Sequence, residues 1–315
     1  MSQTNLPVLI VAGPTAVGKS ALALRLSRAF DGEIVNADSR QVYRYMDIGT
    51  AKPSPEDRNS VPHHLIDVLD PDQEFSLAMF LDLARGAIQD IHARGRLPIV
   101  TGGTGQYIWA LVEGWRPPHV PPDPLLRQQL QREAGLDGGK ALYERLHGVD
   151  PETASRIDPR NLRRVIRALE VHHATGAAPS TLRSKGPSPY NPVIVGLTTA
   201  RDTLYSRIDH RVEEMMQKGL VAEVEGLLNR GYSSDLPSMS SMGYRETALH
   251  LKGELTLEEA SQRIKHETHR FARHQYTWFR LKDPRVQWLE AGLGADRQAA
   301  ALVMEALEKA TAVIK

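Results

Sequence analysis

The chain contains no cysteine, which excludes a disulfide framework, a thiolate metal site and a cysteine nucleophile. It also lacks any run near the ~18 consecutive apolar residues of a membrane-spanning helix. The first apolar run is short and no basic segment precedes it, so we expect no signal peptide. Aromatic residues make up only 6% of the chain, and its apolar and charged fractions of 41% and 24% are typical of a globular protein. We therefore expect a cytoplasmic protein that makes no contact with a membrane.

The charge is balanced overall but unevenly distributed along the chain. The formal net charge is +1, yet residues 156–167 hold five arginines against one aspartate. Residues 263–285 hold seven lysines and arginines, two acidic residues and three histidines. Such basic segments indicate either a polyanionic partner or solvated helix faces. The length of 315 residues is sufficient for about two domains.

A phosphate-binding sequence lies near the start of the chain. Residues 8–12 predict a strand and residues 21–26 predict a helix. The residues between them match the pattern G-x-x-x-x-G-K-S and are Gly13, Pro14, Thr15, Ala16, Val17, Gly18, Lys19 and Ser20. In such a loop the backbone amides converge on an anion at a helix N-terminus, Lys19 reaches a terminal phosphate and Ser20 binds Mg²⁺. An ordinary strand-to-helix turn is the alternative, but motif and context together favour a diphosphate or triphosphate site.

Polar residues follow two further predicted strands. A strand at residues 32–37 ends in Asp38, and a strand at residues 97–100 runs into a second glycine loop at residues 101–107. Because the carboxyl ends of parallel strands face the ligand crevice, we expect Asp38 to lie close to Lys19 and Ser20. A nucleoside triphosphatase usually has an acid after such a strand to serve Mg²⁺ and the attacking water. The second strand ends instead in Thr-Gly-Gly, which disfavours motor and switch proteins and leaves a kinase open.

The remaining pattern predicts an α/β chain with a helical insertion. Further strands are expected at residues 65–68, 193–197 and 286–289. Helices are expected at residues 77–94, 126–134, 140–146, 151–157, 160–175, 205–216 and 257–278, and from residue 295 onward. A proline-rich segment at residues 117–124 marks a boundary. We therefore expect a parallel-sheet core formed by residues 1–118 and 189–315, with an all-helical insertion domain at residues 119–188.

Eight segments, in order along the chain, form a specific set. They are GPTAVGKS (13–20), DSRQVY (38–43), MDIGTAKP (46–53), PHHL (62–65), TGGTGQY (101–107), NLRRVIRALE (161–170), MGY (242–244) and RHQYTWF (273–279). Together they resemble the tRNA dimethylallyltransferase family, also called the tRNA isopentenyl transferase or IPP transferase family. The resemblance implies a P-loop NTPase-like α/β core with a helical insertion.

The resemblance also implies a reaction. The dimethylallyl group of dimethylallyl diphosphate moves to N6 of the adenosine at tRNA position 37, next to the anticodon on its 3′ side. The products are N6-isopentenyladenosine and diphosphate, and Mg²⁺ is required. The acceptor is the anticodon stem-loop of tRNA, and a monomer is the expected state.

The family pattern implies three catalytic residues: Asp38, Thr104 and Arg211. Asp38 is the expected base for the adenine amine, although it could instead contact Mg²⁺ through the water ligands of the ion. Arg211 matches an arginine that grips the diphosphate together with Thr15 and Lys19, with a surface helix charge as the alternative. Thr104 matches a residue that touches the tRNA near the reacting base.

A larger set is implied to contact tRNA. It comprises Asp38, Ser39, Arg40, Gln41, Thr104, Asp123, Arg163, Arg164, Val165, Ile166, Arg167, Ser241, Met242, Gly243, Tyr244, Arg245, Glu246, Arg270 and Arg273. Gln41 could equally belong to a buried hydrogen-bond network, and Arg167 could pack within its own helix. Arg163 and Glu246 stand where some members carry glutamine, which leaves base-specific contacts open at both positions.

Three other functions compete with this interpretation. A small-molecule kinase would explain the phosphate loop but neither the second glycine loop nor the basic insertion. An isopentenyl transferase that acts on free adenine nucleotides would not need the basic segments. An ATP-driven RNA-binding switch is the non-enzymatic alternative. The basic segments and the missing acid favour prenyl transfer to tRNA.

Overall fold

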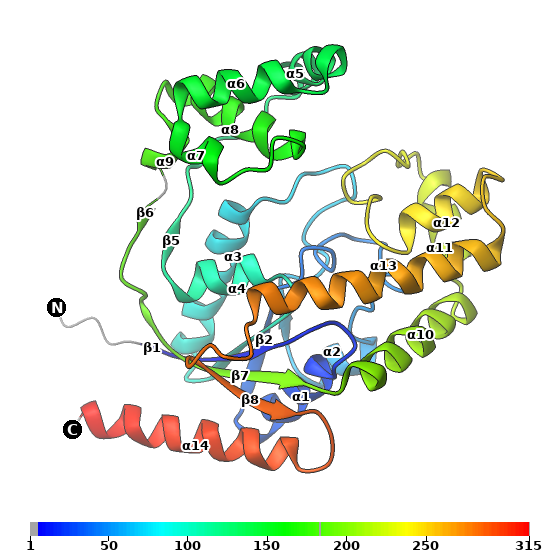
Figure 1. Cartoon of the computed structure of the whole chain (residues 1–315). Coiled ribbons are helices and arrows are strands. Elements are labelled where there is room, and N and C mark those ends of the chain that lie inside the picture. The colour runs from blue at the N-terminus through cyan, green and yellow to red at the C-terminus, as the bar shows by residue number, and fades with distance from the viewer. Residues whose placement is uncertain (1–5, 183, 315) are drawn as a thin grey trace. The chain divides into compact units, whose positions relative to one another are not determined.

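The computed structural model describes residues 6–182 and 184–314 and divides into two compact units. The first unit comprises Met1–Val112 and Ser188–Lys315, and the second comprises Glu113–Pro187 (Figure 1). The first boundary therefore lies at Val112 and not at residue 118 as we expected. None of the helices formed by the described residues is long and apolar enough to cross a membrane.

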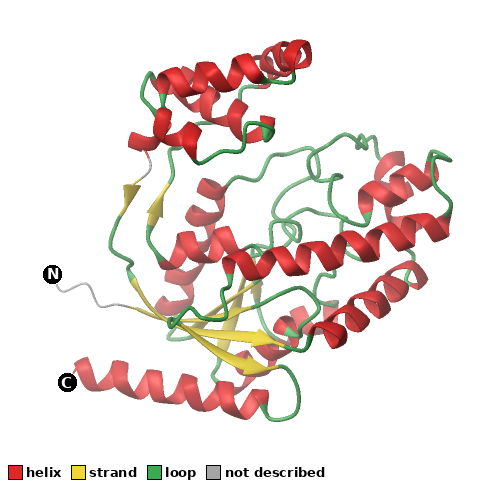
Figure 2. Ribbon diagram, viewed as in Figure 1, coloured by secondary structure: helices red, strands yellow, loops and turns green. Residues whose placement is uncertain are grey.

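A six-stranded sheet forms the centre of the first unit, with strand order β3-β2-β4-β1-β7-β8 (Figure 2). The strands are β1 (Leu6–Ala12), β2 (Gly32–Asn36), β3 (His63–His64), β4 (Leu97–Thr101), β7 (Tyr190–Thr198) and β8 (Val286–Glu290). Every neighbouring pair is parallel, and β2 and β4 are buried along their whole length. Apolar strands of this kind require helices on both faces of the sheet. All carboxyl ends consequently meet at one edge, which is the edge that carries the phosphate loop.

Helices of the first unit pack on this sheet or, in the case of α11 (Leu220–Asn229) and α12 (Tyr244–Leu251), on other helices. The remaining helices are α1 (Lys19–Ala29), α2 (Pro55–Ser60), α3 (Leu77–Ala93), α4 (Gly105–Val112), α10 (Arg201–Gln217), α13 (Leu257–Trp278) and α14 (Ala295–Ile314). Leu22 and Leu26 of α1 pack with Val303 of α14 against apolar residues of the sheet. Figure 1 shows α3 and α4 on the opposite side of the sheet from α14. The predicted helix at residues 257–278 is confirmed with the same bounds.

The strand expected at residues 65–68 is wrong. Leu65 and Asp67 have φ values of 61° and 56°, which extended backbone cannot adopt. β3 ends directly before them, at His64. Asp67 instead accepts hydrogen bonds from Lys52 and Arg58, each at 2.6 Å, so side-chain contacts from another loop determine this turn.

The second unit contains helices and one short ribbon. The helices are α5 (Pro124–Asp137), α6 (Lys140–Val149), α7 (Pro151–Ser155), α8 (Leu162–Thr175) and α9 (Pro179–Leu182). Leu130, Leu146 and Leu169 are among the residues of its apolar core. The all-helical expectation needs correction, because β5 (Trp115–Arg116) pairs antiparallel with β6 (Ser184–Lys185). The segments that enter and leave this unit run side by side, so their backbone groups satisfy one another.

Glu33 of β2 is the most deeply buried acid of the sheet. Its side chain is 3% exposed and lies within 2.6 to 3.1 Å of His64, Arg94 and Arg96. Burial raises the pKa of Glu33, but the hydrogen bonds from Arg94, His64 and Arg96 outweigh burial and lower it to about 2. His64 therefore has a structural partner at the edge of the sheet.

We predict that Glu33→Gln lowers the free energy of unfolding by about 3 kcal/mol near neutral pH. The folded-state pKa of about 2 lies below the ordinary value of 4.5, so the carboxylate stabilises the fold above about pH 4.5. That contribution is lost as the pH falls toward 2. Urea unfolding of both proteins at a series of pH values measures the difference, which should shrink on acidification. The exposed Glu254→Gln serves as the control, and an equal loss in both variants would contradict the prediction.

Candidate active site

The phosphate loop connects β1 to α1, and two of its glycines hold conformations that other residues rarely adopt. Gly13 has φ 140°, and a Cβ there would lie 2.4 Å from the carbonyl oxygen of Leu197. Gly18 has φ 104° and directly precedes α1, so Lys19 is the first residue of the helix. The loop amides consequently lie at the N-terminus of α1, where the helix dipole stabilises an anion.

Lys19 is a desolvated cation with a second cation near it. Its Nζ donates a hydrogen bond to the carbonyl oxygen of Pro14 at 2.6 Å. Burial and the charge of Arg211 lower the pKa of Lys19 to about 7, while Asp38 acts in the opposite direction. Burial also lowers the pKa of Arg211, and Asp38 again opposes the shift. The charges of Asp38 and of Arg211 in α10 thus both act on Lys19, and the expected closeness of Asp38 to Lys19 and Ser20 stays a prediction.

This cluster is suited to an anion with several charges. Two cations that are withdrawn from water repel each other, and one carboxylate offsets that repulsion only in part. A diphosphate bound at the loop would lie against Lys19 and Arg211 and would raise the pKa of the lysine again. The site therefore favours a phosphorylated ligand on electrostatic grounds.

Asp38 is held firmly at the end of β2. Its Oδ1 accepts a hydrogen bond from the amide of Arg40 at 2.8 Å, and its own amide donates to Asn36 Oδ1 at 3.1 Å. Asn36 is buried and donates in turn to the carbonyl oxygen of Leu65 at 3.0 Å. Oδ2 lies on the side of Gly103, 4.0 Å from where a Cβ would stand at that glycine. One oxygen fixes the carboxylate and the other points toward the second glycine loop.

The second glycine loop packs directly against the segment that carries Asp38. A Cβ at Gly102 would lie 2.2 Å from the carbonyl carbon of Ala37, so only glycine fits there. Thr104 donates its amide to the carbonyl oxygen of Ala37 at 3.3 Å, and its hydroxyl accepts from the amide of Ser39 at 3.1 Å. The structure therefore brings together Asp38, Ser39 and Thr104, as the sequence predicted.

Gln275 is a site residue to which the sequence analysis gave no role. Its Oε1 accepts from the amide of Thr15 at 2.7 Å, and its Nε2 donates to the carbonyl oxygen of Gly103 at 2.9 Å. One sequence signal could have identified it. Gln275 lies three residues after Ala272 and four before Phe279, both fully buried, so a polar amide stands in a buried helical stripe. Buried amides need partners, and a partner far along the chain is then expected.

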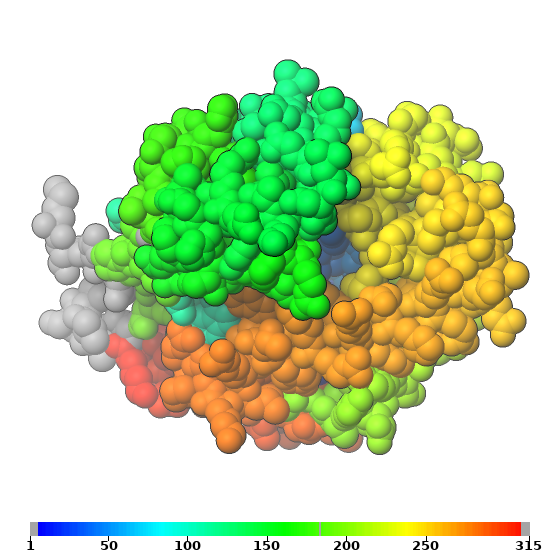
Figure 3. Space-filling model, turned by 45° about the horizontal axis from the view of Figure 1, so that its top comes forward, coloured from blue at the N-terminus to red at the C-terminus, as the bar shows by residue number. Residues whose placement is uncertain are grey.

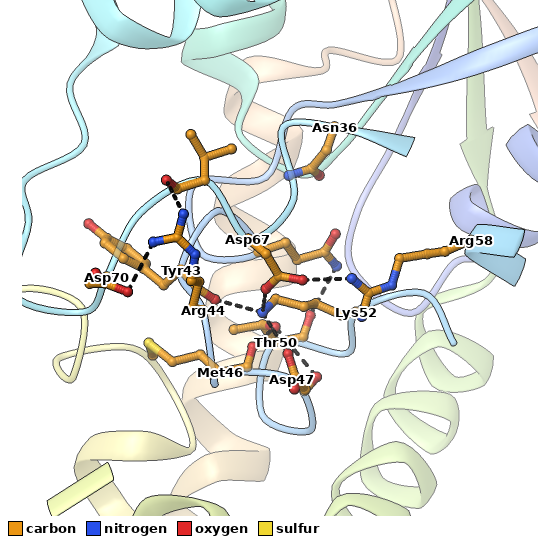
Figure 4. Close-up of polar contacts among 12 residues, drawn as sticks. Asn36, Tyr43, Arg44, Met46, Asp47, Thr50, Lys52, Arg58, Asp67 and Asp70 are labelled. Carbon is orange, nitrogen blue, oxygen red and sulfur yellow. Dashed lines mark hydrogen bonds and ion pairs between the residues drawn. The ribbon is translucent and has the colours of Figure 1, made fainter. Parts of the chain in front are cut away.

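The loop at residues 46–53 surrounds a buried lysine (Figure 4). The side chain of Lys52 is 2% exposed, and Nζ lies 2.6 Å from oxygens of Tyr43, Asp47 and Asp67. Arg58 donates to the other oxygen of Asp67 at 2.6 Å. Ion pairs thus set the shape of this loop, which supports the segment that follows Asp38.

Gln41 and Glu223 hold the same loop from two sides. The Nε2 of Gln41 donates to the carbonyl oxygens of Thr50 and Ala51, each at 3.1 Å. This contact favours the interpretation of Gln41 as part of an internal network. The carboxylate of Glu223 in α11 accepts from the three amides of residues 47–49 at 2.8 to 3.2 Å.

Most of the segment Ser241–Glu246 is buried. The hydroxyl of Tyr244 donates to Glu223 at 2.5 Å, and Glu246 accepts from the amide of Gly243 at 2.9 Å. The buried members are Ser241, Gly243, Tyr244 and Glu246, while Met242 is half-buried. The side chains of Tyr244 and Glu246 thus bind the protein itself, and the contact of this segment with tRNA stays a prediction. Arg245, with 58% of its side chain exposed, is the member of the segment that faces solvent.

Helix α13 reaches the surface of the first unit (Figure 3, orange). Arg270 and Arg273 are exposed, and Arg273 also donates to the hydroxyl of Tyr205 at 3.3 Å. Arg40, which follows the segment of Asp38, donates to the carbonyl oxygen of Pro237 at 2.8 Å. The exposed arginines of α13 are therefore available to phosphates, whereas Arg40 has a structural contact.

The tRNA contacts predicted on helix α8 of the second unit fall into two groups, one exposed and one buried. Arg163 and Arg164 are exposed in the first turn of the helix. Val165 and Ile166 are 0% and 5% exposed and belong to the apolar core of the unit. Helical periodicity turns the side chains of Val165 and Ile166 inward, so their predicted contact with tRNA stays a prediction that the side chains do not support.

Arg167 and Asp123 meet at one buried acid. Glu170 is 1% exposed and accepts hydrogen bonds from the side chains of Arg127 and Arg167 and from the amide of Asp123. Arg167 also donates to the carbonyl oxygen of Val120 at 2.8 Å, which supports its alternative role in packing. Asp123 accepts from the amide of Leu126 at 3.0 Å and so caps α5.

Comparisons with known proteins agree with this geometry. The family model described as IPP transferase matches residues 41–282. A tRNA dimethylallyltransferase of Roseiflexus castenholzii is 58% identical over 87% of this chain and 90% of its own. The crystal structure of the full-length tRNA isopentenylpyrophosphate transferase of Bacillus halodurans is 40% identical, covers 98% of both chains and has a TM-score of 0.72. A eukaryotic dimethylallyltransferase acting on tRNA is 29% identical, with a TM-score of 0.81 over 97% of this chain and 80% of its own.

The matches cover most of the chain, and the fold is the expected P-loop-like α/β fold with a central parallel sheet. The chain therefore belongs to the IPP transferase family, whose members are transferases.

Proposed function

We propose that the protein transfers the dimethylallyl group from dimethylallyl diphosphate to N6 of the adenosine at tRNA position 37, next to the anticodon on its 3′ side. The products are N6-isopentenyladenosine and diphosphate. The observation that carries the proposal is the cluster of Lys19, Arg211 and Asp38, which joins an anion site to a carboxylate. The names of the relatives support the same reaction. We place the reaction in the cytoplasm and treat the enzyme as a monomer.

The donor side of the reaction needs stabilisation of negative charge. As the bond between the allylic carbon and the diphosphate oxygen breaks, the electron pair stays with the diphosphate. The loop amides, Lys19 and Arg211 stabilise that leaving group. No water has to be activated, which agrees with a threonine-glycine sequence after β4 in place of an acid.

Oxygens of the substrate and a protein hydroxyl group together would hold Mg²⁺ at this site. The described residues contain no group of three or more His, Cys, Asp or Glu side chains that could hold a metal ion by themselves. Ser20 is exposed in the first turn of α1, directly after Lys19. Its hydroxyl, together with diphosphate oxygens, forms the kind of oxygen donor set that Mg²⁺ prefers. When bound there, the ion would neutralise part of the charge of the leaving diphosphate.

The acceptor side needs a base. The exocyclic amine of adenine is a weak nucleophile, and it must lose a proton as its nitrogen bonds to the allylic carbon. Asp38 accepts that proton, with Oδ1 fixed by the amide of Arg40 and Thr104 anchored beside it through Ser39. A base in an anticodon loop leaves its stack at small cost, so the adenosine can reach the carboxylate.

The exposed arginines bind the RNA backbone. In the first unit these are Arg245, Arg270 and Arg273, and in the second they are Arg163 and Arg164. Guanidinium groups neutralise phosphates and release counterions, which gives affinity without base specificity.

One experiment tests the reaction class. The protein is incubated with Mg²⁺, an anticodon stem-loop RNA and labelled dimethylallyl diphosphate, and the nucleosides are analysed by mass spectrometry. We expect isopentenyladenosine at the adenosine 3′ to the anticodon. A parallel incubation with labelled ATP and with free AMP tests the kinase and the free-nucleotide transferase. Phosphate transfer without prenyl transfer would overturn the proposal.

We predict that Asp38→Asn lowers kcat by about 10³-fold while stem-loop affinity changes less than about threefold. The amide can still accept from Arg40 but cannot take the proton of the adenine amine. If a high Mg²⁺ concentration restored the activity of Asp38→Asn, Asp38 would act on the metal ion, because added Mg²⁺ cannot replace a missing base. The exposed Asp235→Asn is the matched control, and full activity of Asp38→Asn would reject its role as base.

We predict that stem-loop binding weakens steeply with salt and that the double substitution Arg270→Ala and Arg273→Ala reduces this dependence. The slope of log K against log salt should become shallower by about 1 to 2, because two phosphate contacts are lost. Filter binding across a salt series measures both slopes. Arg297→Ala, an exposed arginine of α14, should leave the slope unchanged. A flat response in the wild type would contradict the assignment of tRNA as substrate.

A further inference from the structure

Gln275 is a buried side chain that joins the two loops that follow the neighbouring strands β1 and β4. It is 2% exposed, and α13 delivers it between the phosphate loop and the second glycine loop. Oε1 accepts from the amide of Thr15 at 2.7 Å, and Nε2 donates to the carbonyl oxygen of Gly103 at 2.9 Å. A side chain with only donors or only acceptors could not make both bonds, so the bridge needs a group that does both, as an amide or a protonated carboxyl group does.

The bridge ends next to the carboxylate of Asp38. A Cβ at Gly103 would lie 2.5 Å from Nε2 of Gln275 and 4.0 Å from Oδ2 of Asp38. Gly103 is thus placed between the glutamine and the aspartate. The residue after it, Thr104, bonds to the segment of Asp38 through Ser39 and Ala37. One end of the bridge therefore contacts the diphosphate side, and the other contacts the side where adenine is deprotonated.

We propose that Gln275 is a positioning residue that sets the separation between the phosphate loop and the loop of Gly103. The inference rests on the proposed prenyl transfer. Displacement at the allylic carbon requires the leaving oxygen, the carbon and the incoming nitrogen to be aligned, and a shift of about 1 Å can cost about 100-fold in rate. Each loop keeps its own contacts to its substrate without the bridge. Loss of the bridge consequently lowers kcat and leaves the KM values for dimethylallyl diphosphate and for tRNA unchanged.

Gln275→Glu provides a test with a pH signature. As a carboxylate, Glu at this position accepts from Thr15 but cannot donate to Gly103. As a carboxylic acid it makes both bonds. Burial and the nearby charge of Asp38 raise the pKa of such a carboxyl group. We expect kcat to fall more than about tenfold near pH 8, with both KM values changed less than about threefold. The ratio of wild-type to variant kcat should shrink toward about pH 6 as the acid form returns.

Three further variants complete the test. Gln275→Met removes both bonds, and its deficit should not depend on pH. In Gly103→Ala the added Cβ would lie 2.5 Å from Nε2 of Gln275 and would displace that side chain. The φ angle of Gly103 is one that alanine adopts, so the variant should lower kcat with unchanged KM. Gln262→Glu, an exposed position on the same helix, should behave as the wild type. Thermal unfolding and the active fraction are measured for each variant, and if Gln275→Glu does not fold, Gly103→Ala decides.

Four results would overturn the inference: an increase in KM alone, wild-type kcat in Gln275→Met, wild-type kcat in Gly103→Ala, or a deficit of Gln275→Glu that acid does not relieve. An inactive wild type would refute the proposed function instead, so the two failures are distinguishable.

Discussion

The desolvated pair of cations, Lys19 and Arg211, is the constraint on which the site depends. Keeping two positive groups close together away from water costs free energy, and the shifts in their pKa values express that cost. The rigid strand-loop-helix unit of β1 and α1 holds the lysine, and helix α10 holds the arginine. Packing elsewhere in the fold offsets the repulsion, and a bound polyanion relieves it. The site therefore favours a ligand that carries several negative charges.

The parallel sheet explains why three loops reach this point. Carboxyl ends of β1, β2 and β4 lie at one edge, so the phosphate loop, the segment of Asp38 and the second glycine loop become neighbours. Glycines then allow backbone to pack on backbone, as at Gly102 against Ala37. Helix α13 adds Gln275, which ties together the loops that follow the neighbouring strands β1 and β4. The site is thus assembled from main-chain contacts, with few side chains left to carry the chemistry.

Local sequence signals predict much of the fold and of the site, whereas the features that they miss depend on long-range contacts. The phosphate loop, Asp38 and the bounds of α13 follow from motif, strand order and periodicity. The turn at residues 65–68 depends on Lys52 and Arg58, and the bridge of Gln275 joins residues 260 positions apart. Helix α8 shows what a motif alone does not separate. Helical periodicity turns Val165 and Ile166 into the apolar core of the second unit and leaves Arg163 and Arg164 exposed.

The end of β4 shows how a P-loop-like α/β fold can avoid hydrolysis of its phosphorylated substrate. A triphosphatase places an acid there that orients water for attack. In this chain Thr101 occupies the end of β4, and its hydroxyl donates to the carbonyl oxygen of Val11 in β1 at 3.2 Å. The side chain is committed to the neighbouring strand and is almost fully buried, so it cannot activate a water. The carboxylate of the site comes instead from the end of β2, where Asp38 faces the second glycine loop. An acid at the end of β2 faces the incoming amine and does not face a water molecule beside the phosphate. This position suits transfer of the dimethylallyl group to an amine better than hydrolysis.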